Sequence, residues 1–397
     1  MNLCLAMAIG SLILATIPAI MFAGNLRQFN RLPDDGPGVN KNLPPISVLI
    51  PARNEAGSIA SAVVSVLANT GIVLELIVLD DHSTDGTAEI VNQIAAKDDR
   101  LRLFSAPALP DGWCGKQYAC QVLSDHARYQ SMLWMDADVR LENNALATMA
   151  VELARNPAAL LSGFPFQGAR SWLEILLIPL MHFILLGFLP IKKMRRHPSP
   201  SLGAGCGQLF LTRRRDYVEA GGHAAIRASL HDGITLPRAF RKRGKLTDIF
   251  DASSLAQCRM YDSAGAVWRG LLKNAGEGIA TPAGIFPWTV LLLGGQVFPA
   301  GLTIYLLIKH PEKTLSLLIS ALAAAMGITI RLICARRYYS RNPSFSKYAS
   351  ALAHPIGVFI FLLIQWHSVI RRLTGRHSTW KGRSYSCERT DTIVKQC

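Results

Sequence analysis

Four long apolar runs limit most strongly what this chain can fold into. One opens the sequence and three close it: Leu3–Ala23, Trp288–Ile308, Leu315–Cys334 and Tyr348–Ile370. At about 1.5 Å per helical residue, each is about long enough to cross the roughly 30 Å hydrocarbon core of a bilayer. Half of the 397 residues are hydrophobic and only 17% are charged. We therefore predict a multi-pass membrane protein, with an anchor at residues 1–25, membrane helices at 285–372 and a basic tail at 373–397.

The basic residues beside these runs predict which side of the membrane the chain occupies. The formal net charge is +15, and Arg27 and Arg31 follow the first run, whereas no basic residue precedes it. This order argues against a cleaved signal peptide, which starts with a basic segment. Because Lys and Arg mark the cytoplasmic side, we expect the chain after residue 25 to lie in the cytoplasm, at the cell (inner) membrane. Residues 26–45, rich in Pro, Gly, Asn and Asp, are a predicted linker.

The three closing runs raise a question about the number of membrane crossings. Basic clusters begin at Arg336 after the second of these runs and at Arg371 after the third, so charge puts both segments on the cytoplasmic side. Three complete crossings would instead put the tail outside. One run must therefore be a hairpin or lie in the interface. Gly294 and Gly295 with Pro299 make the first closing run the one that we expect to break.

Between the anchor and the closing runs, residues 46–280 alternate between strand and helix patterns. Ile46–Ile50, Leu74–Leu79 and Ser131–Met135 are predicted strands, and stretches of helical spacing separate them. This alternation predicts an α/β fold with a mostly parallel sheet and helices on both faces. The apolar segment 172–191 is expected to be an interfacial or buried helix, since a full crossing would separate residues that we assign to one site.

Polar residues follow the first two predicted strands, at the sheet edge where ligands bind in such folds. Pro51, Ala52 and Glu55 come after the first strand, at a helix start whose free N–H groups and carboxylate can hold a nucleotide. Taken alone, this pattern is more often a plain helix cap. The adjacent carboxylates of Asp80 and Asp81 end the second strand and repel each other, so they need a reason to be there. One of them can accept the imide N–H of uracil.

Two further acidic motifs suit a diphosphate and an acceptor. Asp136 and Asp138 follow the third strand, and carboxylates one residue apart can bind a hard divalent cation, Mg²⁺ or Mn²⁺. Such a cation neutralises a diphosphate as it leaves. The pair His231-Asp232 opens a predicted helix, where a carboxylate is stabilised as an anion and can act as a base on an acceptor hydroxyl. Each motif alone also has a structural explanation, a solvated loop for the first and an N-cap for the second.

Together, the order and spacing of these four motifs resemble the family 2 glycosyltransferases, whose nucleotide-sugar-binding fold is called GT-A. The resemblance covers about residues 46–280. It implies that the segments after the first two strands hold the donor nucleoside, that the D-x-D pair binds the donor and the metal, and that Asp232 is the base of an inverting transfer. His231 occupies the position where the family usually has Glu. The function of that Glu beside the base therefore has no counterpart in this sequence.

A narrower likeness concerns the membrane glycosyltransferases of carotenoid (diaponeurosporenoate-type) and hopanoid pathways. The segment Leu109–Lys116, which leads to the D-x-D pair, resembles these enzymes, as do Gly203–Gly207 and Trp380–Arg383. The likeness implies that Lys116 lies near the donor. We therefore expect transfer of a sugar from a nucleotide diphosphate donor, with a UDP-sugar as the first candidate. The expected acceptor is a lipid such as a carotenoid, a hopanoid or another isoprenoid or glycerolipid.

Two other functions stay open on the sequence. A polysaccharide synthase is disfavoured because its Q-x-x-R-W signature is absent and Trp268-Arg269 has the reverse order. These two residues are candidates for an interfacial or acceptor-binding helix. The best support for a third function, a non-catalytic membrane scaffold with a degenerate domain, is His231. Nucleic-acid binding is not expected, because the basic clusters flank apolar runs and no nucleic-acid-binding motif occurs.

Overall fold

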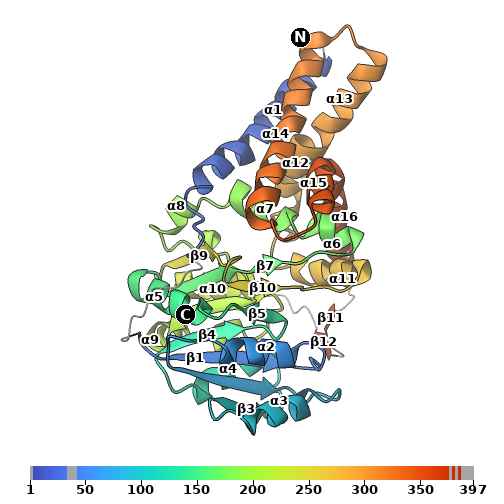
Figure 1. The fold of residues 1–397 in the computed structure, drawn as a ribbon. Coiled ribbons are helices and arrows are strands. Elements are labelled where there is room, and N and C mark those ends of the chain that lie inside the picture. Colours follow the sequence, from blue (N-terminus) through green and yellow to red (C-terminus); the bar gives the residue numbers. More distant parts are fainter. Residues whose placement is uncertain (1–2, 34–42, 375–377, 381–382, 386–397) are drawn as a thin grey trace, which may run out of the picture.

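A layered α/β domain carries a long helical extension (Figure 1). The computed structural model describes residues 3–33, 43–374, 378–380 and 383–385. The main sheet has seven strands in the order β3-β2-β1-β4-β8-β6-β9. Its strands are β1 (Ile46–Ala52), β2 (Leu74–Asp80), β3 (Leu101–Ser105), β4 (Ser131–Met135), β6 (Leu160–Phe164), β8 (Leu209–Arg213) and β9 (Thr247–Asp251).

The pairing within this sheet confirms the predicted fold class. Strand β1 pairs in parallel with both β2 and β4, β2 pairs in parallel with β3, and β6 with β9. Only β8 runs antiparallel to its neighbours β4 and β6. A small second sheet, in the order β5-β10-β7, lies beside the end of β4. Its strands are β5 (Val139–Leu141), β7 (Phe166–Gln167) and β10 (Ala256–Cys258), and a separate hairpin pairs β11 (Ser378–Trp380) with β12 (Arg383–Tyr385).

Helices cover both faces of the main sheet because successive strand residues point to opposite sides. Val48 of β1 belongs to the core on one face, and Leu49 belongs to the core on the other. The first face is covered by α2 (Ile59–Leu67), α3 (Thr87–Ala95) and α5 (Ala145–Arg155). The second face is covered by α4 (Gly115–His126), α9 (Arg214–Ala220) and α10 (Asp232–Lys242).

The apolar segment after β7 forms two helices rather than one. Helix α6 (Trp172–Leu177) begins with a capping box between Ser171 and Glu174, and α7 (Leu180–Phe188) begins just after Pro179. Short turns follow as α8 (Ile191–Met194), η1 (Pro200–Leu202) and η2 (His223–Ile226). Helices α6 and α7 pack in an apolar cluster with α1 (Leu3–Asn25), α11 (Ala264–Ala275) and the closing helices, on the side of the domain that faces the helical extension.

The N-terminal helix α1 (Leu3–Asn25) is fastened to the domain at its last residue. The amide nitrogen of Asn25 donates to the carbonyl oxygens of Leu186 and Leu189 at 2.8 and 2.6 Å, and its amide oxygen accepts from the N–H of Ile191 at 3.3 Å. Asn25 is buried, and Pro18 of α1 contacts Gly187 at a point where any side chain would press on the proline. The anchor and α7 therefore form one packed unit.

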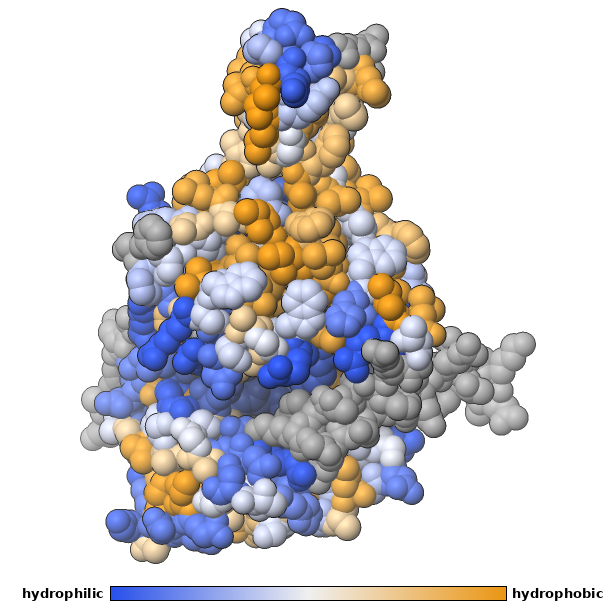
Figure 2. Space-filling model, turned by 90° about the vertical axis from the view of Figure 1, so that its right-hand side faces the viewer, coloured by the Kyte–Doolittle hydropathy of each residue, from blue (hydrophilic) through white to orange (hydrophobic). Residues whose placement is uncertain are grey.

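Four helices are long and apolar enough to cross a membrane: Leu3–Asn25, Ile285–Lys309, Thr314–Tyr338 and His354–Leu373. Figure 2 shows apolar surface gathered over the helical extension, between a hydrophilic tip and the hydrophilic domain. The second of these helices comprises α12 (Ile285–Leu292), the π-helical segment η3 (Leu293–Val297) and α13 (Phe298–Lys309), and the others are α1, α14 (Thr314–Tyr338) and α16 (His354–Leu373). This arrangement is that of a membrane protein.

The expectation that the first closing run breaks at Gly294, Gly295 and Pro299 is wrong. That run continues through the π-helical segment η3, where Gly295 lies so close to Leu14 of α1 that a side chain would overlap its backbone. Gly295 therefore allows two helices to pack closely and does not form the turn of a hairpin. The third closing run is the one that breaks, into α15 (Ser344–Leu352) and α16. Pro355 lies in the first turn of α16, where a residue without an N–H is tolerated.

Candidate active site

Two loops at the carboxyl ends of β1 and β2 are tied into one surface. The N–H of Asn54 donates to Ser83 Oγ at 2.9 Å, and Asn54 Oδ1 accepts from the N–H of Thr84 at 2.8 Å. Asn54 and His82 have positive φ angles of 52° and 55°, which non-glycine residues seldom adopt. Such strain persists only where surrounding contacts hold it, and it clusters at ligand sites.

The acidic residues predicted for the nucleoside line these loops. Asp80 Oδ2 accepts from the N–H of Ser83 at 3.2 Å, whereas Asp80 Oδ1 is buried and has no hydrogen-bond partner in the described chain. Asp81 lies 3.7 Å from the guanidinium of Arg53. Glu55 accepts from Ser58 Oγ at 2.9 Å, and Pro51 and Ala52 are the last residues of β1. The structure therefore brings this predicted set to one edge of the sheet.

Lys116, in the first turn of α4, connects two motifs that are far apart in sequence. Its Nζ lies 2.8 Å from Asp136 Oδ1 and 2.9 Å from Asp232 Oδ2, and it donates to the carbonyl oxygen of Gly207 at 3.4 Å. Its side chain is 20% exposed. Burial alone would lower the pKa of Lys116, but the two carboxylates raise it well above its usual value. Lys116 is therefore a fixed cation between the D-x-D pair and the candidate base.

Asp232 is the first residue of α10, and the structure places it beside the D-x-D motif. Besides Lys116, it accepts from the N–H of Gly233 at 2.8 Å, as expected for an anion at a helix N-terminus. Burial alone would raise the pKa of Asp232, but Lys116 holds it below its ordinary value. Burial also lowers the pKa of the ring of the neighbouring His231 below its usual value. Asp232 is thus a carboxylate at neutral pH, as a proton acceptor must be.

Asp138 is held differently from Asp136. Burial and the charge of Asp136 raise the pKa of Asp138 to about 7, and a hydrogen bond with Cys258 opposes that rise. Asp138 Oδ1 is buried and has no hydrogen-bond partner in the described chain. The described residues contain no cluster of three or more His, Cys, Asp or Glu side chains that alone could hold a metal ion. The free oxygen fits a divalent cation that takes its other ligands from a bound diphosphate and water.

Two further side chains of this region carry no sequence signal that predicts them. Cys258 lies on β10, directly opposite Val139 of β5, and strand pairing brings its thiol to Asp138. Glu277, just after α11, accepts from the N–H of Leu230 at 2.7 Å and from Ser229 Oγ. Glu277 therefore ties α11 to the loop that carries Asp232. No local sequence signal marks either residue.

The two candidate acceptor residues on α11 have different surroundings. The indole N–H of Trp268 donates to His367 Nδ1 of α16 at 3.2 Å, and Trp268 packs in the apolar cluster of the membrane side. Arg269 is exposed on the same helix. Trp268 thus joins α11 to α16, and neither residue forms a described hydrogen bond or ion pair with the acidic cluster.

Comparison with known proteins agrees with this geometry. Residues 47–220 match the model of the family described as glycosyl transferase family 2. Residues 47–220 therefore form a family 2 glycosyltransferase domain. The family 2 domain thus covers β1 to α9 and includes Lys116 and the D-x-D pair, and the scaffold alternative has no support from the comparison.

Curated relatives and a solved structure extend the likeness beyond the family 2 domain. The chain is 28% identical over 222 residues to a 4,4'-diaponeurosporenoate glycosyltransferase of Staphylococcus haemolyticus, a match that spans 55% of this chain and 57% of that protein. It is 25% identical over 360 residues to the protein of the same name from Staphylococcus aureus, spanning 88% and 90% of the two chains. The mannosyltransferase PcManGT from Pyrobaculum calidifontis, solved with GDP-Man and Mn²⁺, has a TM-score of 0.55 at 18% identity, covering 93% and 99%. The last likeness shows a shared fold.

Replacing Gly207 by alanine should disable the family 2 site without unfolding the protein. A Cβ atom at Gly207 would overlap the carboxylate of Asp232, so the carboxylate must move. Overpacking of this kind costs about 1–3 kcal/mol, and a displacement of about 1 Å in a reacting group can slow catalysis about 100-fold. We expect a loss of that size in kcat for Gly207→Ala, measured as sugar transfer in membranes. Gly301→Ala, where a Cβ meets nothing within 4 Å, is the control, and equal activity of both variants would contradict the prediction.

Proposed function

We propose that this glycosyltransferase moves a sugar from a nucleotide diphosphate donor, a UDP-sugar, to a lipid acceptor, with inversion at the anomeric carbon. The observation that carries the proposal is the ion-pair cluster in which Lys116 lies within 2.9 Å of both Asp136 and Asp232. A donor bound over the β1 and β2 loops would bring its diphosphate to Asp136 and Asp138. The acceptor would then approach from the side of α11 and Asp232.

Each residue has a distinct part in this proposed reaction. The acceptor oxygen attacks the anomeric carbon while the bond from that carbon to the diphosphate oxygen breaks, and the diphosphate leaves with the electron pair. Asp232 takes the proton of a hydroxyl acceptor, or orients a carboxylate acceptor that has no proton to lose. Asp136 and Asp138 would hold a Mg²⁺ or Mn²⁺ ion, which supplies charge neutralisation of the diphosphate. Lys116 adds a positive charge at the same place.

The acceptor proposed here is a carotenoid-type lipid. Two observations support it: the curated relatives are named 4,4'-diaponeurosporenoate glycosyltransferases, and α11 links the Asp232 loop through Glu277 to the helices of the apolar cluster. A lipid dissolved in the bilayer would reach the site along this side. Hopanoids and other isoprenoids or glycerolipids are the next candidates, and a long polymer product would instead favour a polysaccharide synthase.

Two measurements test the proposed function. Isothermal titration of the full chain with UDP plus Mn²⁺ should show binding, and binding of neither UDP nor another nucleoside diphosphate would overturn the donor proposal. Mass spectrometry of lipids from cells with and without the gene should show a glycosylated lipid only where the gene is present. A chain that binds nucleotide but changes no lipid would keep the donor and refute the lipid acceptor.

For the membrane topology we propose three crossings, by α1, α12–α13 and α14, with the hairpin of α15 and α16 returning to the cytoplasmic side. The two ends of the hairpin contact the α/β domain: Arg341 pairs with Glu142 at 3.2 Å, and Arg372 donates to the carbonyl oxygen of Ala280 at 3.0 Å. The opposite end of the bundle brings Lys313 to Cys4. With this arrangement the number of crossings is odd, and both basic clusters lie on the cytoplasmic side.

Fusions to alkaline phosphatase, which is active only outside the cytoplasm, distinguish this topology from four crossings. We expect activity for a fusion after Glu312, in the turn between α13 and α14, and none for a fusion after Asn342. A fusion after Thr374, beyond α16, should also be inactive. Activity of the Thr374 fusion would show that α16 crosses the membrane and would contradict the hairpin.

A further inference from the structure

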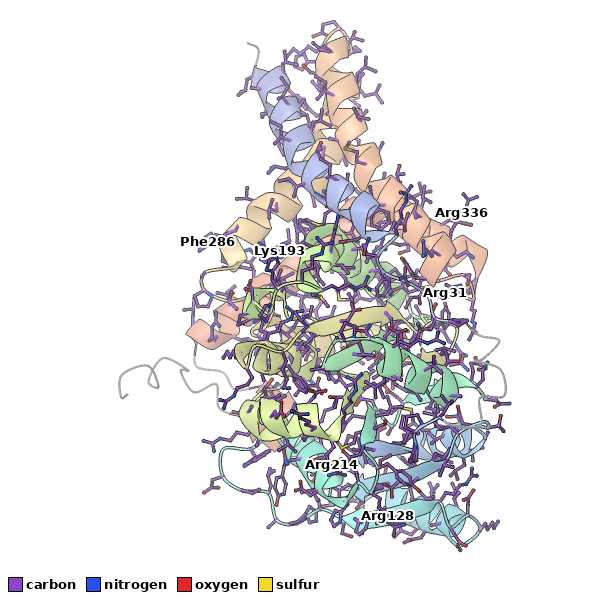
Figure 3. The ribbon with its side chains drawn as sticks, turned by 90° about the vertical axis from the view of Figure 1, so that its left-hand side faces the viewer. Arg31, Arg128, Lys193, Arg214, Phe286 and Arg336 are labelled. Carbon is purple, nitrogen blue, oxygen red and sulfur yellow. The ribbon has the colours of Figure 1, made fainter. Side chains whose placement is uncertain are left out.

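Exposed cations form a basic collar where the helical extension leaves the α/β domain. The basic collar consists of Arg27, Lys192, Lys193, Arg196 and Arg336, all exposed. Figure 3 shows Lys193 and Arg336 at the base of the membrane helices, in a band that also includes Arg31. None of the five side chains forms an ion pair or a hydrogen bond with another residue in the described part of the chain.

Neighbouring arginines hold the three segments of the collar together. Arg195, between Lys193 and Arg196, pairs with Asp248 at 2.8 Å and donates to the carbonyl oxygen of Gln28 at 2.9 Å. Arg31 pairs with Asp251 at 3.1 Å and donates to the carbonyl oxygen of Arg337. These bonds join the end of α1, the turn α8 and the end of α14. The collar is therefore a single fixed surface rather than a set of separate charges.

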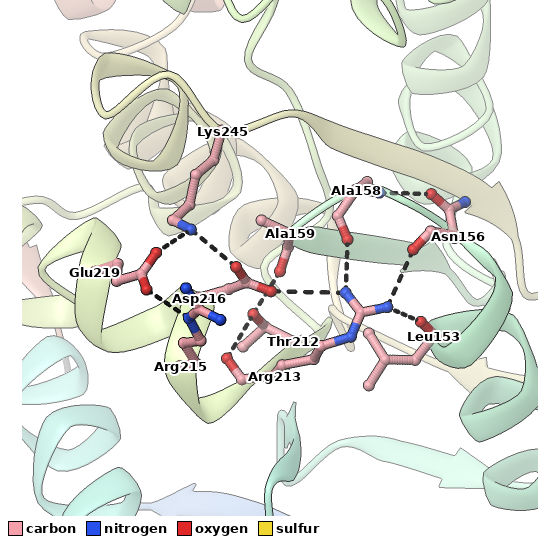
Figure 4. Close-up of polar contacts among 10 residues, drawn as sticks. All are labelled: Leu153, Asn156, Ala158, Ala159, Thr212, Arg213, Arg215, Asp216, Glu219 and Lys245. Atoms are coloured by element: carbon pink, nitrogen blue, oxygen red, sulfur yellow. Dashed lines mark hydrogen bonds and ion pairs between the residues drawn. The ribbon is translucent and has the colours of Figure 1, made fainter.

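Other basic residues of the domain are neutralised by carboxylates. Lys245 lies 2.8 Å from Asp216 and 2.6 Å from Glu219, and Arg215 lies 2.8 Å from Glu219 (Figure 4). Arg213 pairs with Asp216 at 3.6 Å and also donates to backbone carbonyls. Figure 3 shows Arg128 and Arg214 well away from the helical extension. Lys245, Arg213 and Arg215 are compensated by carboxylates, whereas the five cations of the collar have no such partner in the described part of the chain.

The surface next to the collar is apolar. Ile17 and Ile20 of α1 are 43% and 70% exposed and precede Arg27 by two to three turns, and Phe286 of α12 is 65% exposed. Figure 3 shows Phe286 near the level of Lys193. A bilayer matches this surface, because its apolar core lies directly next to a layer of charged headgroups. Long basic side chains at this boundary extend into the headgroups.

We propose that the basic collar binds the anionic headgroups of phospholipids in the cytoplasmic leaflet. The proposal needs the helices to be inserted in a membrane, but it does not depend on the identity of the sugar donor or acceptor. Binding at three linked segments sets the height and tilt of the α/β domain on the bilayer. Because α11 and Asp232 belong to that domain, the same contacts set the distance between the site and a lipid acceptor.

The test uses the full chain in nanodiscs of equal parts phosphatidylglycerol and phosphatidylcholine, released for native mass spectrometry. The wild-type protein should retain phosphatidylglycerol in excess. Each basic residue at an anionic surface strengthens binding by about fivefold. In the triple variant Lys192→Gln, Lys193→Gln and Arg196→Gln, the excess of phosphatidylglycerol should therefore fall at least about fivefold. The charge-preserving variant Lys192→Arg, Lys193→Arg and Arg196→Lys should keep it.

A double variant at the other end of the domain is the matched control. Arg128→Gln with Arg215→Gln removes cations whose side chains are 65% and 85% exposed, and it should leave the lipid excess unchanged. Equal retention of both lipids by the wild type would overturn the proposal, and so would an equal loss in the control. Displacement of the bound anionic lipid by short RNA at equimolar charge would point to nucleic acid instead and would also refute it. Nucleotide titration of the same samples distinguishes these outcomes from a failure of the proposed function.

Discussion

The variant Asp232→Asn is expected to lower kcat for transfer to a hydroxyl acceptor by about 10²–10⁴-fold, the usual worth of a general base. Asparagine keeps the shape of the side chain and its contact with Gly233, but it cannot accept the acceptor proton. The measurement is the initial rate of glycolipid formation in membranes at saturating donor. Donor binding should stay within a few fold, because the diphosphate is still neutralised by Lys116 and by the cation that Asp136 and Asp138 would hold.

A control and an alternative acceptor sharpen this test. Asp216→Asn removes a carboxylate from the first turn of another helix, α9, where it pairs with Lys245 far from the site, and it should leave the rate unchanged. With a carboxylate acceptor no proton is transferred, so Asp232→Asn should cost much less. Full activity of Asp232→Asn with both acceptor types would exclude Asp232 from catalysis.

The variant Lys116→Met is expected to damage both stability and turnover. Removing one partner of a largely buried ion pair costs about 3–5 kcal/mol, and the two carboxylates that Lys116 contacts would be left to repel each other. Loss of a charge that stabilises a leaving group costs a further 10²–10³-fold in kcat. Thermal unfolding in detergent measures the first effect, and transfer rates below the unfolding midpoint measure the second.

Lys245→Met separates the two effects, because Lys245 also bridges two carboxylates and its side chain is 17% exposed, close to the 20% of Lys116. This control should lower the unfolding midpoint and leave turnover intact. In the double variant Lys116→Met with Asp136→Asn, removal of one repelling charge should restore part of the stability but none of the activity. If Lys116→Met had the same turnover as Lys245→Met, the role of Lys116 in transfer would be refuted.

Local sequence patterns were sufficient to predict the parallel strands β1, β2 and β4 and most of the acidic site, but not β6, β8 and β9. Each of Asp80, Asp81 and Asp136 follows a short apolar strand, and parallel strands end at a common edge, so their meeting needs no long-range information. Asp232 was assigned to the site from the resemblance to a family. Its approach to Asp136 depends on where α10 lies on the sheet, which no local pattern contains.

The contacts that escaped prediction all join segments distant in sequence. Lys116 meets Asp232 across 116 residues only because α4 and α10 cover the same face of the sheet. Cys258 reaches Asp138 through the register of β10 with β5. The break in the third closing run escaped because Gly294 and Gly295 resemble a breaking point, and their real use, close packing against Leu14, requires knowledge of α1.

The bonds of Asn25 have a practical consequence for anyone who wishes to purify the enzyme. A truncation that removes the first 25 residues would strip the carbonyls of Leu186 and Leu189 of their partner and uncover an apolar face of α7. Such a fragment would aggregate rather than dissolve, although it would contain every acidic residue of the site. The N-terminal segment is a component of the fold, and solubilisation must rely on detergent or lipid rather than on cutting the protein free.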